Sequence, residues 1–242
     1  MKTPPLILLH GALGAADQMQ ALQTALAPDF QTFTFSFSGH GGLPLPDAPL
    51  SIGLFADDLL RFMDAENLPQ ADVFGYSMGG YVALEFARRH PARLRRIATL
   101  GTKFGWSPDI AAREAAMLNP EKWEAKVPQF AQMLAARHAP TDWKTLTQRT
   151  AEMMLALGNG AALTGAQLAD IQQPVQIMVG ELDNMVSREE SEWAAGNLPG
   201  GSFECLPGVK HPFEQVDVGM LAERMRVFFE WAAAKTSRFL HR

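Results

Sequence analysis

The stretch at residues 75–80 reads Gly-Tyr-Ser-Met-Gly-Gly and sets a single serine, Ser77, among three glycines. An apolar segment precedes it and a helix-like run follows it. A turn between a strand and a helix can hold such a serine in a strained conformation, because Gly75 and Gly79 remove side chains that would collide across the bend. The free N–H groups of the following helix point toward the same place. Ser77 is therefore a candidate nucleophile, and a structural serine in a glycine-rich turn is the alternative.

A serine nucleophile needs a base to remove its proton, and the chain has six histidines. His211 directly follows an apolar, strand-like segment, and catalytic groups gather in the loops at the carboxyl ends of parallel strands. It is therefore the favoured base, with a surface histidine of no catalytic role as the alternative. Three others are expected to be solvated, at helix ends or in the C-terminal tail: His90, His138 and His241. The remaining two stand beside glycines after apolar segments: His10 and His40.

A carboxylate is needed to orient the base, and it too should follow a strand. The segment Gly180-Glu181-Leu182-Asp183 follows the apolar run at 175–179 and offers two candidates. Asp183 lies further beyond the end of the strand and is favoured. Alternate residues of a turn can face the same side, so Glu181 stays open. The order along the chain is Ser77, then the carboxylate, then His211.

The elements that must position these residues alternate between apolar strands and amphipathic helices. Nearly continuous apolar strands are typical of a parallel sheet that helices cover on both faces, so the fold class is α/β with a mostly parallel, doubly wound sheet. The predicted strands are 6–9, 30–37, 71–76, 94–100, 174–180 and 202–206. The predicted helices between and after them are 15–27, one beginning at Ser51, 78–90, 188–197 and 217–235.

The alternation is interrupted at residues 103–168, which contain no clear strand. Apolar residues at helical spacing predict three helices there: 108–118, 121–138 and 141–157. We interpret residues 103–168 as a helical insertion within one domain, whose core comprises residues 1–102 and 169–242.

The composition excludes several other classes of protein. The chain has 242 residues, of which 47% are hydrophobic, which is enough for one sizeable core. Its net charge is −5, and the one dense basic cluster, residues 88–96, is interpreted as a solvated helix end, so no nucleic-acid partner is expected. Cys205 is the only cysteine, which precludes an intrachain disulfide.

The hydropathy of the chain predicts no membrane span and no signal peptide. No apolar run reaches 18 residues, and the apolar run at the N-terminus is short and ends at His10-Gly11. A cytoplasmic location is the expectation, and the oligomeric state stays open.

Taken in order along the chain, five segments resemble the α/β-hydrolase superfamily. They are His-Gly-Ala-Leu-Gly at 10–14, Ser-Gly-His-Gly at 38–41, the serine turn at 75–80, Gly-Glu-Leu-Asp at 180–183 and Val-Lys-His-Pro at 209–212. The order serine, aspartate, histidine is also that of the superfamily. The resemblance implies a catalytic triad of Ser77, Asp183 and His211. It further implies an oxyanion hole formed by the backbone N–H groups of Ala12 and Met78, and no cofactor or metal.

The resemblance also assigns a role to the helical insertion, which is similar to the cap that covers the substrate pocket in this superfamily. Leu13 and two aromatic residues near the start of the insertion, Phe104 and Trp106, are predicted to line that pocket. We expect an apolar pocket and a small-molecule substrate with an apolar acyl part.

The leading hypothesis is a serine hydrolase that cleaves a small carboxylic ester through an acyl-enzyme. The same residues could serve a C–C bond hydrolase of the dienoate type, and the fold could belong to a ligand receptor that turns over slowly. The glycine motifs also resemble the menaquinone-pathway lyase that eliminates pyruvate. That family typically has an arginine after the double glycine to hold substrate carboxylates, whereas this chain has Tyr81.

Overall fold

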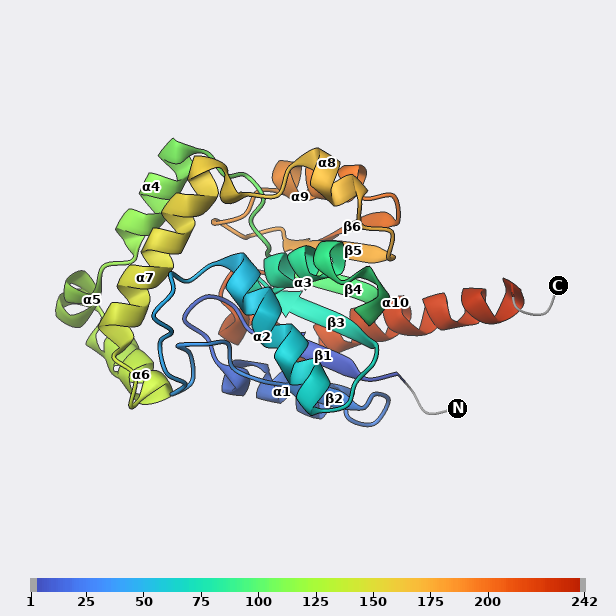
Figure 1. The fold of residues 1–242 in the computed structure, drawn as a ribbon, viewed down its shortest axis with the longest axis horizontal. Coiled ribbons are helices and arrows are strands. Elements are labelled where there is room, and N and C mark those ends of the chain that lie inside the picture. Colours follow the sequence, from blue (N-terminus) through green and yellow to red (C-terminus); the bar gives the residue numbers. More distant parts are fainter. Residues whose placement is uncertain (1–3, 240–242) are drawn as a thin grey trace.

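The computed structural model describes the backbone of residues 4–239 and the side chains of residues 4–229, and its centre is a six-stranded sheet (Figure 1). Every neighbouring pair of strands is parallel, and the spatial order is β2-β1-β3-β4-β5-β6. The strands are β1 (Leu6–Leu9), β2 (Thr32–Thr34), β3 (Ala71–Tyr76), β4 (Leu94–Leu100), β5 (Val175–Gly180) and β6 (Gly201–Leu206). The prediction of a parallel α/β sheet is therefore confirmed.

The strand order reverses at β1, and this reversal leaves room for a site at the carboxyl ends of the strands. After β1 the chain crosses to β2 at one edge of the sheet, then returns to β3 on the other side of β1. Leu9 and Gly75 are partners in the register, so the loops that follow β1 and β3 leave the sheet side by side. Loops that diverge at such a switch point leave a crevice at the carboxyl ends of the strands.

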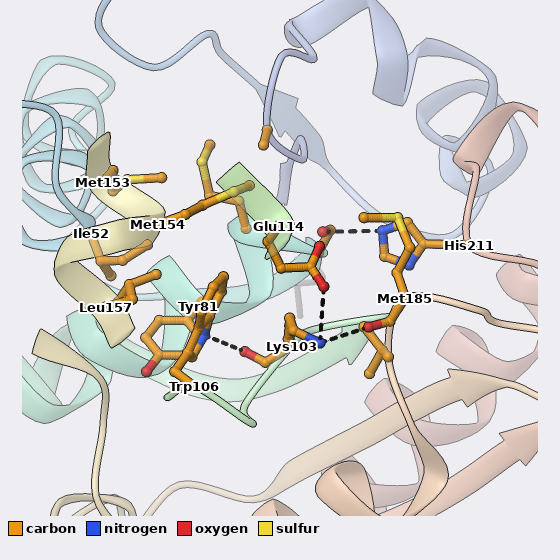
Figure 2. A pocket seen from close by; sticks show the side chains of 14 residues that line it. Ile52, Tyr81, Lys103, Trp106, Glu114, Met153, Met154, Leu157, Met185 and His211 are labelled. Carbon is orange, nitrogen blue, oxygen red and sulfur yellow. Dashed lines mark hydrogen bonds and ion pairs between the residues drawn. The ribbon is translucent and has the colours of Figure 1, made fainter. Parts of the chain in front are cut away.

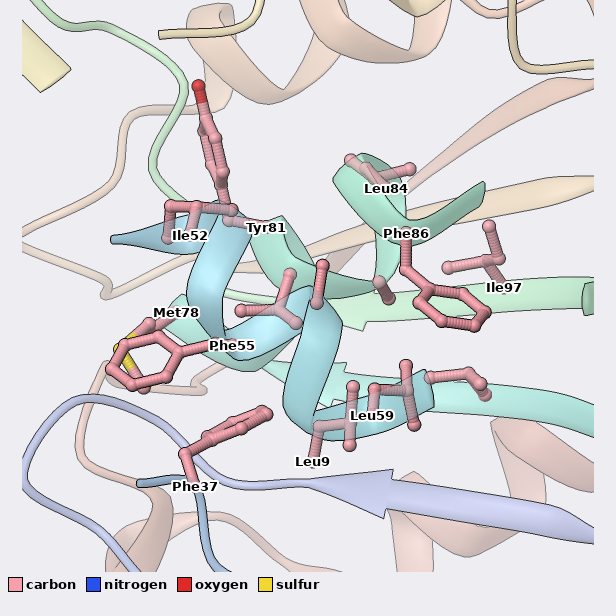
Figure 3. Close-up of a cluster of buried hydrophobic side chains, with 14 of the residues drawn as sticks. Leu9, Phe37, Ile52, Phe55, Leu59, Met78, Tyr81, Leu84, Phe86 and Ile97 are labelled. Carbon is pink, nitrogen blue, oxygen red and sulfur yellow. The ribbon is translucent and has the colours of Figure 1, made fainter. Parts of the chain in front are cut away.

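Two layers of helices cover the sheet because strand side chains alternate between its faces. Ile7 and Leu9 belong to the hydrophobic cluster beneath α2 (Ile52–Ala65), α3 (Met78–Arg89) and α9 (Arg188–Asn197). Part of this cluster, including Leu9, Phe37 and Leu59, is shown in Figure 3. Leu6 and Leu8 belong to the opposite cluster, with α1 (Gln20–Leu26) and α10 (Val218–Phe239).

Further helices form a layer at the end of the sheet toward which β3 points (Figure 1). They are α4 (Pro108–Met117), α5 (Pro120–Lys126), α6 (Pro128–His138), α7 (Trp143–Ala156) and a single π-helical turn η3 (Leu157–Ala161). The chain then forms α8 (Gly165–Ala169), which lies beside α9. The short 3-10 turns of the chain are η1 (Ala16–Met19), η2 (Pro91–Arg93) and η4 (Phe213–Gln215). None of the helices in residues 4–239 combines the length and apolar character that crossing a bilayer requires.

Several elements differ from the predictions. The helix predicted over 121–138 is two helices, because Pro128 has no N–H to donate and starts α6 as its first residue. The strand predicted over 30–37 pairs only at Thr32–Thr34, since β2 is an edge strand. Helix α8 was not predicted because five residues are too few to show helical periodicity.

Candidate active site

Ser77 lies in a strained turn between β3 and α3, as predicted. Its backbone has φ 50° and ψ −115°, a left-handed conformation that costs free energy for a residue with a side chain. A Cβ atom at Gly75 would collide with the backbone of Gly79 and Gly80. A Cβ atom at Gly79 would lie 2.6 Å from the carbonyl oxygen of Leu9. Both glycines are therefore required by the close approach of α3 to β1 and β3.

His211 and Asp183 complete a hydrogen-bonded series with Ser77. The Oγ atom of Ser77 lies 3.4 Å from Nε2 of His211, and Nδ1 of His211 lies 2.8 Å from Oδ2 of Asp183. The first contact is long, as is common when no substrate is bound. Glu181 is elsewhere: its carboxylate accepts a hydrogen bond from the amide of Gly208 at 2.9 Å. The structure therefore brings Asp183, and not Glu181, to the histidine.

The Asp183 carboxylate is held as an anion. Its side chain is 1% exposed, and Oδ1 accepts hydrogen bonds of 2.9 Å from the amides of both Met185 and Val186. Burial raises the pKa of Asp183, but the hydrogen bonds from His211 and these two amides outweigh burial and keep the pKa below its ordinary value. An ionised Asp183 accepts the Nδ1–H of His211, which leaves Nε2 free to accept a proton from Ser77.

Tyr76 supports His211, and the sequence analysis did not identify it. Its hydroxyl donates a 2.8 Å hydrogen bond to the backbone carbonyl of His211, and its ring packs 5.5 Å from the imidazole. Burial raises the pKa of Tyr76, so the hydroxyl stays protonated and remains a donor. The signal in the sequence is only its place beside Ser77, which does not show which residue its hydroxyl reaches.

Ala12 and Met78 line the same cavity as Ser77. Within the part of the chain that the structure describes, neither amide donates a hydrogen bond to a protein group. The loop that carries Ala12 is fixed from both sides: Gly11 donates to Gln18, and the carbonyl of Leu13 accepts from His138 at 3.0 Å. The two amides are thus available donors on a rigid support.

The Ser77 cavity is mainly apolar, and part of its wall comes from the helical insertion (Figure 2). Trp106 lines it, as predicted. Leu13 and Phe104, the other two residues predicted to line the pocket, lie in the hydrophobic core and are not among the residues that line this cavity. Phe104 packs 6.0 Å from the ring of Tyr81, which itself lines the cavity. The remaining lining residues labelled in Figure 2 include Ile52, Met153, Met154, Leu157 and Met185.

Two charged residues in the cavity wall were not anticipated from the sequence. Lys103, just beyond the end of β4, and Glu114, on α4, face each other with 3.5 Å between Nζ and Oε1 (Figure 2). Both side chains are mostly buried, with 17% and 12% exposed, respectively. A charged residue on a helix is usually solvated, so the residue types gave no signal of this placement.

The histidines that are not near Ser77 include a buried cluster. His138 was expected to be solvated, but it is fully buried. It accepts a 3.0 Å hydrogen bond from the amide of Gly41 and donates to Leu13, so it is neutral. Its ring packs 5.7 Å from His40, which packs 5.1 Å from His10. His90 is half-buried at the end of α3, and His241 lies outside the described residues.

Comparison with known proteins places this geometry in a family. A family model described as the alpha/beta hydrolase fold matches residues 4–160. A pimeloyl-[acyl-carrier protein] methyl ester esterase of Aromatoleum aromaticum is 31% identical over 88% of this chain and 95% of its own. A putative carbamate hydrolase RutD of Caulobacter vibrioides is 29% identical over 93% of this chain and 90% of its own.

A solved structure agrees on the fold. The 2-hydroxy-6-oxo-6-phenylhexa-2,4-dienoate hydrolase of Rhodococcus sp. strain RHA1 superposes with a TM-score of 0.78 at 18% identity, covering 94% of this chain and 90% of that one. The matched family model spans both the loop after β1 and the turn that carries Ser77. The chain therefore belongs to the α/β-hydrolase fold family and is a hydrolase.

Proposed function

We propose that the protein hydrolyses small carboxylic esters through an acyl-enzyme on Ser77. The observation that carries the proposal is the series Ser77 Oγ, His211 and Asp183, with contacts of 3.4 and 2.8 Å, at the wall of an apolar cavity. The name of the 31% identical relative, a methyl ester esterase, supports cleavage of the same class of bond.

In the first half of the reaction, Ser77 Oγ attacks the ester carbonyl carbon while His211 Nε2 takes the hydroxyl proton. Asp183 holds the imidazole in the required tautomer and stabilises the imidazolium. The carbonyl oxygen gains negative charge and accepts hydrogen bonds from the amides of Ala12 and Met78, each worth about 10²–10³ in rate in comparable enzymes. The tetrahedral intermediate then collapses, and His211 returns the proton to the departing alcohol.

In the second half, water repeats the sequence on the acyl-enzyme. His211 removes a proton from the water, whose oxygen attacks the acyl carbon, and the same two amides receive the oxyanion. Collapse releases the carboxylic acid and returns the proton from His211 to Ser77 Oγ. In each half His211 Nε2 receives one proton, from Ser77 Oγ or from water, and gives it up again, to the leaving alcohol oxygen or to Ser77 Oγ.

The helical insertion, residues 103–168, serves as the cap in this proposal. It supplies Trp106, Met153, Met154 and Leu157 to the cavity, which is an apolar wall suited to an acyl or alkyl group. The cavity is small: the centre of a water molecule can reach a volume of about 60 Å³ within it. This size favours a short acyl or alkyl group.

Tyr81 argues against the lyase that eliminates pyruvate. Its hydroxyl accepts a 2.6 Å hydrogen bond from the amide of Leu163, and burial raises its pKa to about 12. A neutral hydroxyl engaged in this way carries no positive charge with which to hold a substrate carboxylate, as an arginine would.

The test combines labelling of the active-site serine with assays of substrates that differ in the bond to be cleaved. A fluorophosphonate probe should label the wild-type protein and not Ser77→Ala, and short p-nitrophenyl esters should be hydrolysed by the wild type alone. A vinylogous diketone is assayed in parallel, and faster cleavage of that compound would assign the site to C–C hydrolysis. Ligand-induced thermal stabilisation without labelling or turnover would instead indicate a receptor.

A further inference from the structure

The polar side of the Ser77 cavity is formed by Lys103 and Glu114, and Glu190 contacts Lys103 from outside the cavity lining. Lys103 Nζ donates a 2.8 Å hydrogen bond to the carbonyl of Met185 and lies 3.5 Å from Glu114 and 3.9 Å from Glu190. The carbonyl of Lys103 accepts a 3.1 Å hydrogen bond from the Trp106 indole, which fixes the backbone as well. Lys103 is thus tied at both ends.

Glu190 is fully occupied by the backbone. Its Oε1 accepts from the amides of Phe104 and Gly105 at 2.8 and 3.2 Å. Its Oε2 accepts from the amide of Ser187 at 3.3 Å, as part of the capping box of α9. Glu190 therefore balances the charge of Lys103 and also fixes the backbone at the start of the helical insertion.

Glu114 has a different environment. Among the described residues, its carboxylate accepts no hydrogen bond, and its one charged neighbour is Lys103 at 3.5 Å. A carboxylate offers about four acceptor positions, so Glu114 has acceptor capacity that no donor of the described residues uses. Glu114 also faces the cavity that Ser77 and His211 line, with only 12% of its side chain exposed. Its unused acceptor positions are therefore available to a donor group of a molecule bound in the cavity.

The charged side chains around the cavity determine which charge on a substrate group is favoured there. The charged side chains that line the cavity are Lys103 and Glu114, and two further carboxylates lie behind this wall: Glu190 against Lys103 and Asp183 against His211. In a cavity of low dielectric constant this surplus of negative charge repels a substrate carboxylate and attracts an ammonium group.

We propose that Glu114 is a specificity-determining residue that accepts hydrogen bonds from a donor group of the substrate, preferentially an ammonium and secondarily a hydroxyl. The inference rests on the proposed function, because it gives the class of ester that the Ser77 cavity takes. It also differs from a purely structural role, in which Glu114 would serve only to join α4 to Lys103.

Substituted phenylboronic acids test this inference, because their boron accepts the lone pair of Ser77 Oγ while His211 takes the proton. The meta or para position of the ring carries an aminomethyl, hydroxymethyl, methyl or carboxylate group. Dissociation constants are measured for the wild type, for Glu114→Gln and for the control Glu121→Gln, an exposed glutamate of the same insertion.

In the wild type, the aminomethyl compound should bind about tenfold more tightly than the methyl compound at one ring position at least, as a charged hydrogen bond provides. The carboxylate compound should bind most weakly. In Glu114→Gln the aminomethyl advantage should fall to about twofold or less, whereas Glu121→Gln should retain it.

An aminomethyl compound that binds the wild type no better than the methyl compound at both ring positions overturns the inference, and this comparison needs no variant to fold. If Glu114→Gln still binds the aminomethyl compound about tenfold more tightly than the methyl compound, the inference is overturned as well, because Glu114 would then serve only to join α4 to Lys103. If no boronic acid binds, or if binding is unchanged in Ser77→Ala, the proposed function fails too, so the two failures are distinguishable.

Discussion

The Asp183 carboxylate accepts three hydrogen bonds, from His211 and from the amides of Met185 and Val186. Asp183→Asn keeps the shape, but its amide nitrogen can donate to Nδ1 and so select the wrong tautomer of His211. We expect kcat on a p-nitrophenyl ester to fall by about 10³–10⁴, with KM little changed. Glu181→Gln is the matched control and should keep its activity. Equal losses in both variants would contradict the assignment of Asp183.

Tyr76 and Tyr81 are both buried, and each hydroxyl forms a hydrogen bond with the backbone. Tyr76 bonds to the carbonyl of His211, and Tyr81 accepts from the amide of Leu163. Tyr76→Phe leaves the carbonyl of His211 without its donor, which should cost about 1–3 kcal/mol of unfolding free energy. Because that carbonyl belongs to the base, we expect kcat to fall about tenfold with KM unchanged. Tyr81→Phe lies in the cavity wall and should change KM more than kcat. The opposite pattern in steady-state kinetics would refute the positioning role of Tyr76.

Sequence reasoning singled out Ser77, Asp183 and His211 by their types and their order along the chain, and the structure brings these three side chains together. It missed Tyr76, Lys103 and Glu114, because a tyrosine or a charged residue on a predicted element gives no indication of what its tip will contact. Leu13 shows the same limit, since its left-handed backbone, with φ 56°, presents its carbonyl to His138 and its side chain to the core.

Among the helices and strands, boundaries were predictable where a local signal exists. Helix α9 spans Arg188–Asn197 as predicted, and Ser187 caps it with Glu190 in a capping box. Helix α2 likewise begins after Ser51, whose side chain accepts from the amide of Leu54. The extent of β2 depends on its neighbour β1 and on its place at the sheet edge, which local sequence does not specify.

Helix α6 ends at His138, which joins the helical insertion to two core loops through Leu13 and Gly41. His138→Ala removes a donor and an acceptor at once, and we expect kcat to fall about tenfold or more as the loop bearing Ala12 loosens. The thermal midpoint should fall by several degrees. His138→Gln can supply one donor and one acceptor and should recover part of kcat. His90→Ala, at the end of α3, is the control. An unchanged kcat in His138→Ala would show that the loop is rigid without the insertion.

For the whole chain, the alternation of strands and helices predicted the fold class because a parallel sheet requires apolar strands joined by helices. The cavity could not be predicted in the same way. Its wall combines α3, α4 and α7 with the loops after β1, β4 and β5, and their packing depends on contacts between segments far apart in the sequence. Figure 1 shows these elements meeting at one end of the sheet.

The buried histidines make the stability of the whole molecule sensitive to acid. Burial lowers the pKa of His10 to about 4, and burial also lowers the pKa values of His40 and His138. The unfolded chain binds these protons below about pH 6.5 while the folded chain does not, so stability is complete above that pH and is lost toward pH 4. For His10 alone the loss between pH 7 and pH 5 is about 2 kcal/mol.

Asp72 acts in the opposite direction, because burial raises its pKa to about 6 and the folded chain takes up that proton first. Between pH 7 and pH 5, protonation of Asp72 adds about 1 kcal/mol to the free energy of unfolding, which is less than the loss from His10 alone. The folded state should therefore lose stability on acidification, and urea unfolding followed at pH 7 and pH 5 measures the loss. His40→Met removes one titrating group and should give a smaller loss than the wild type, whereas the control His90→Gln should match the wild type. An equal loss in His40→Met and the wild type would mean that His40 takes up its proton without unfolding the chain.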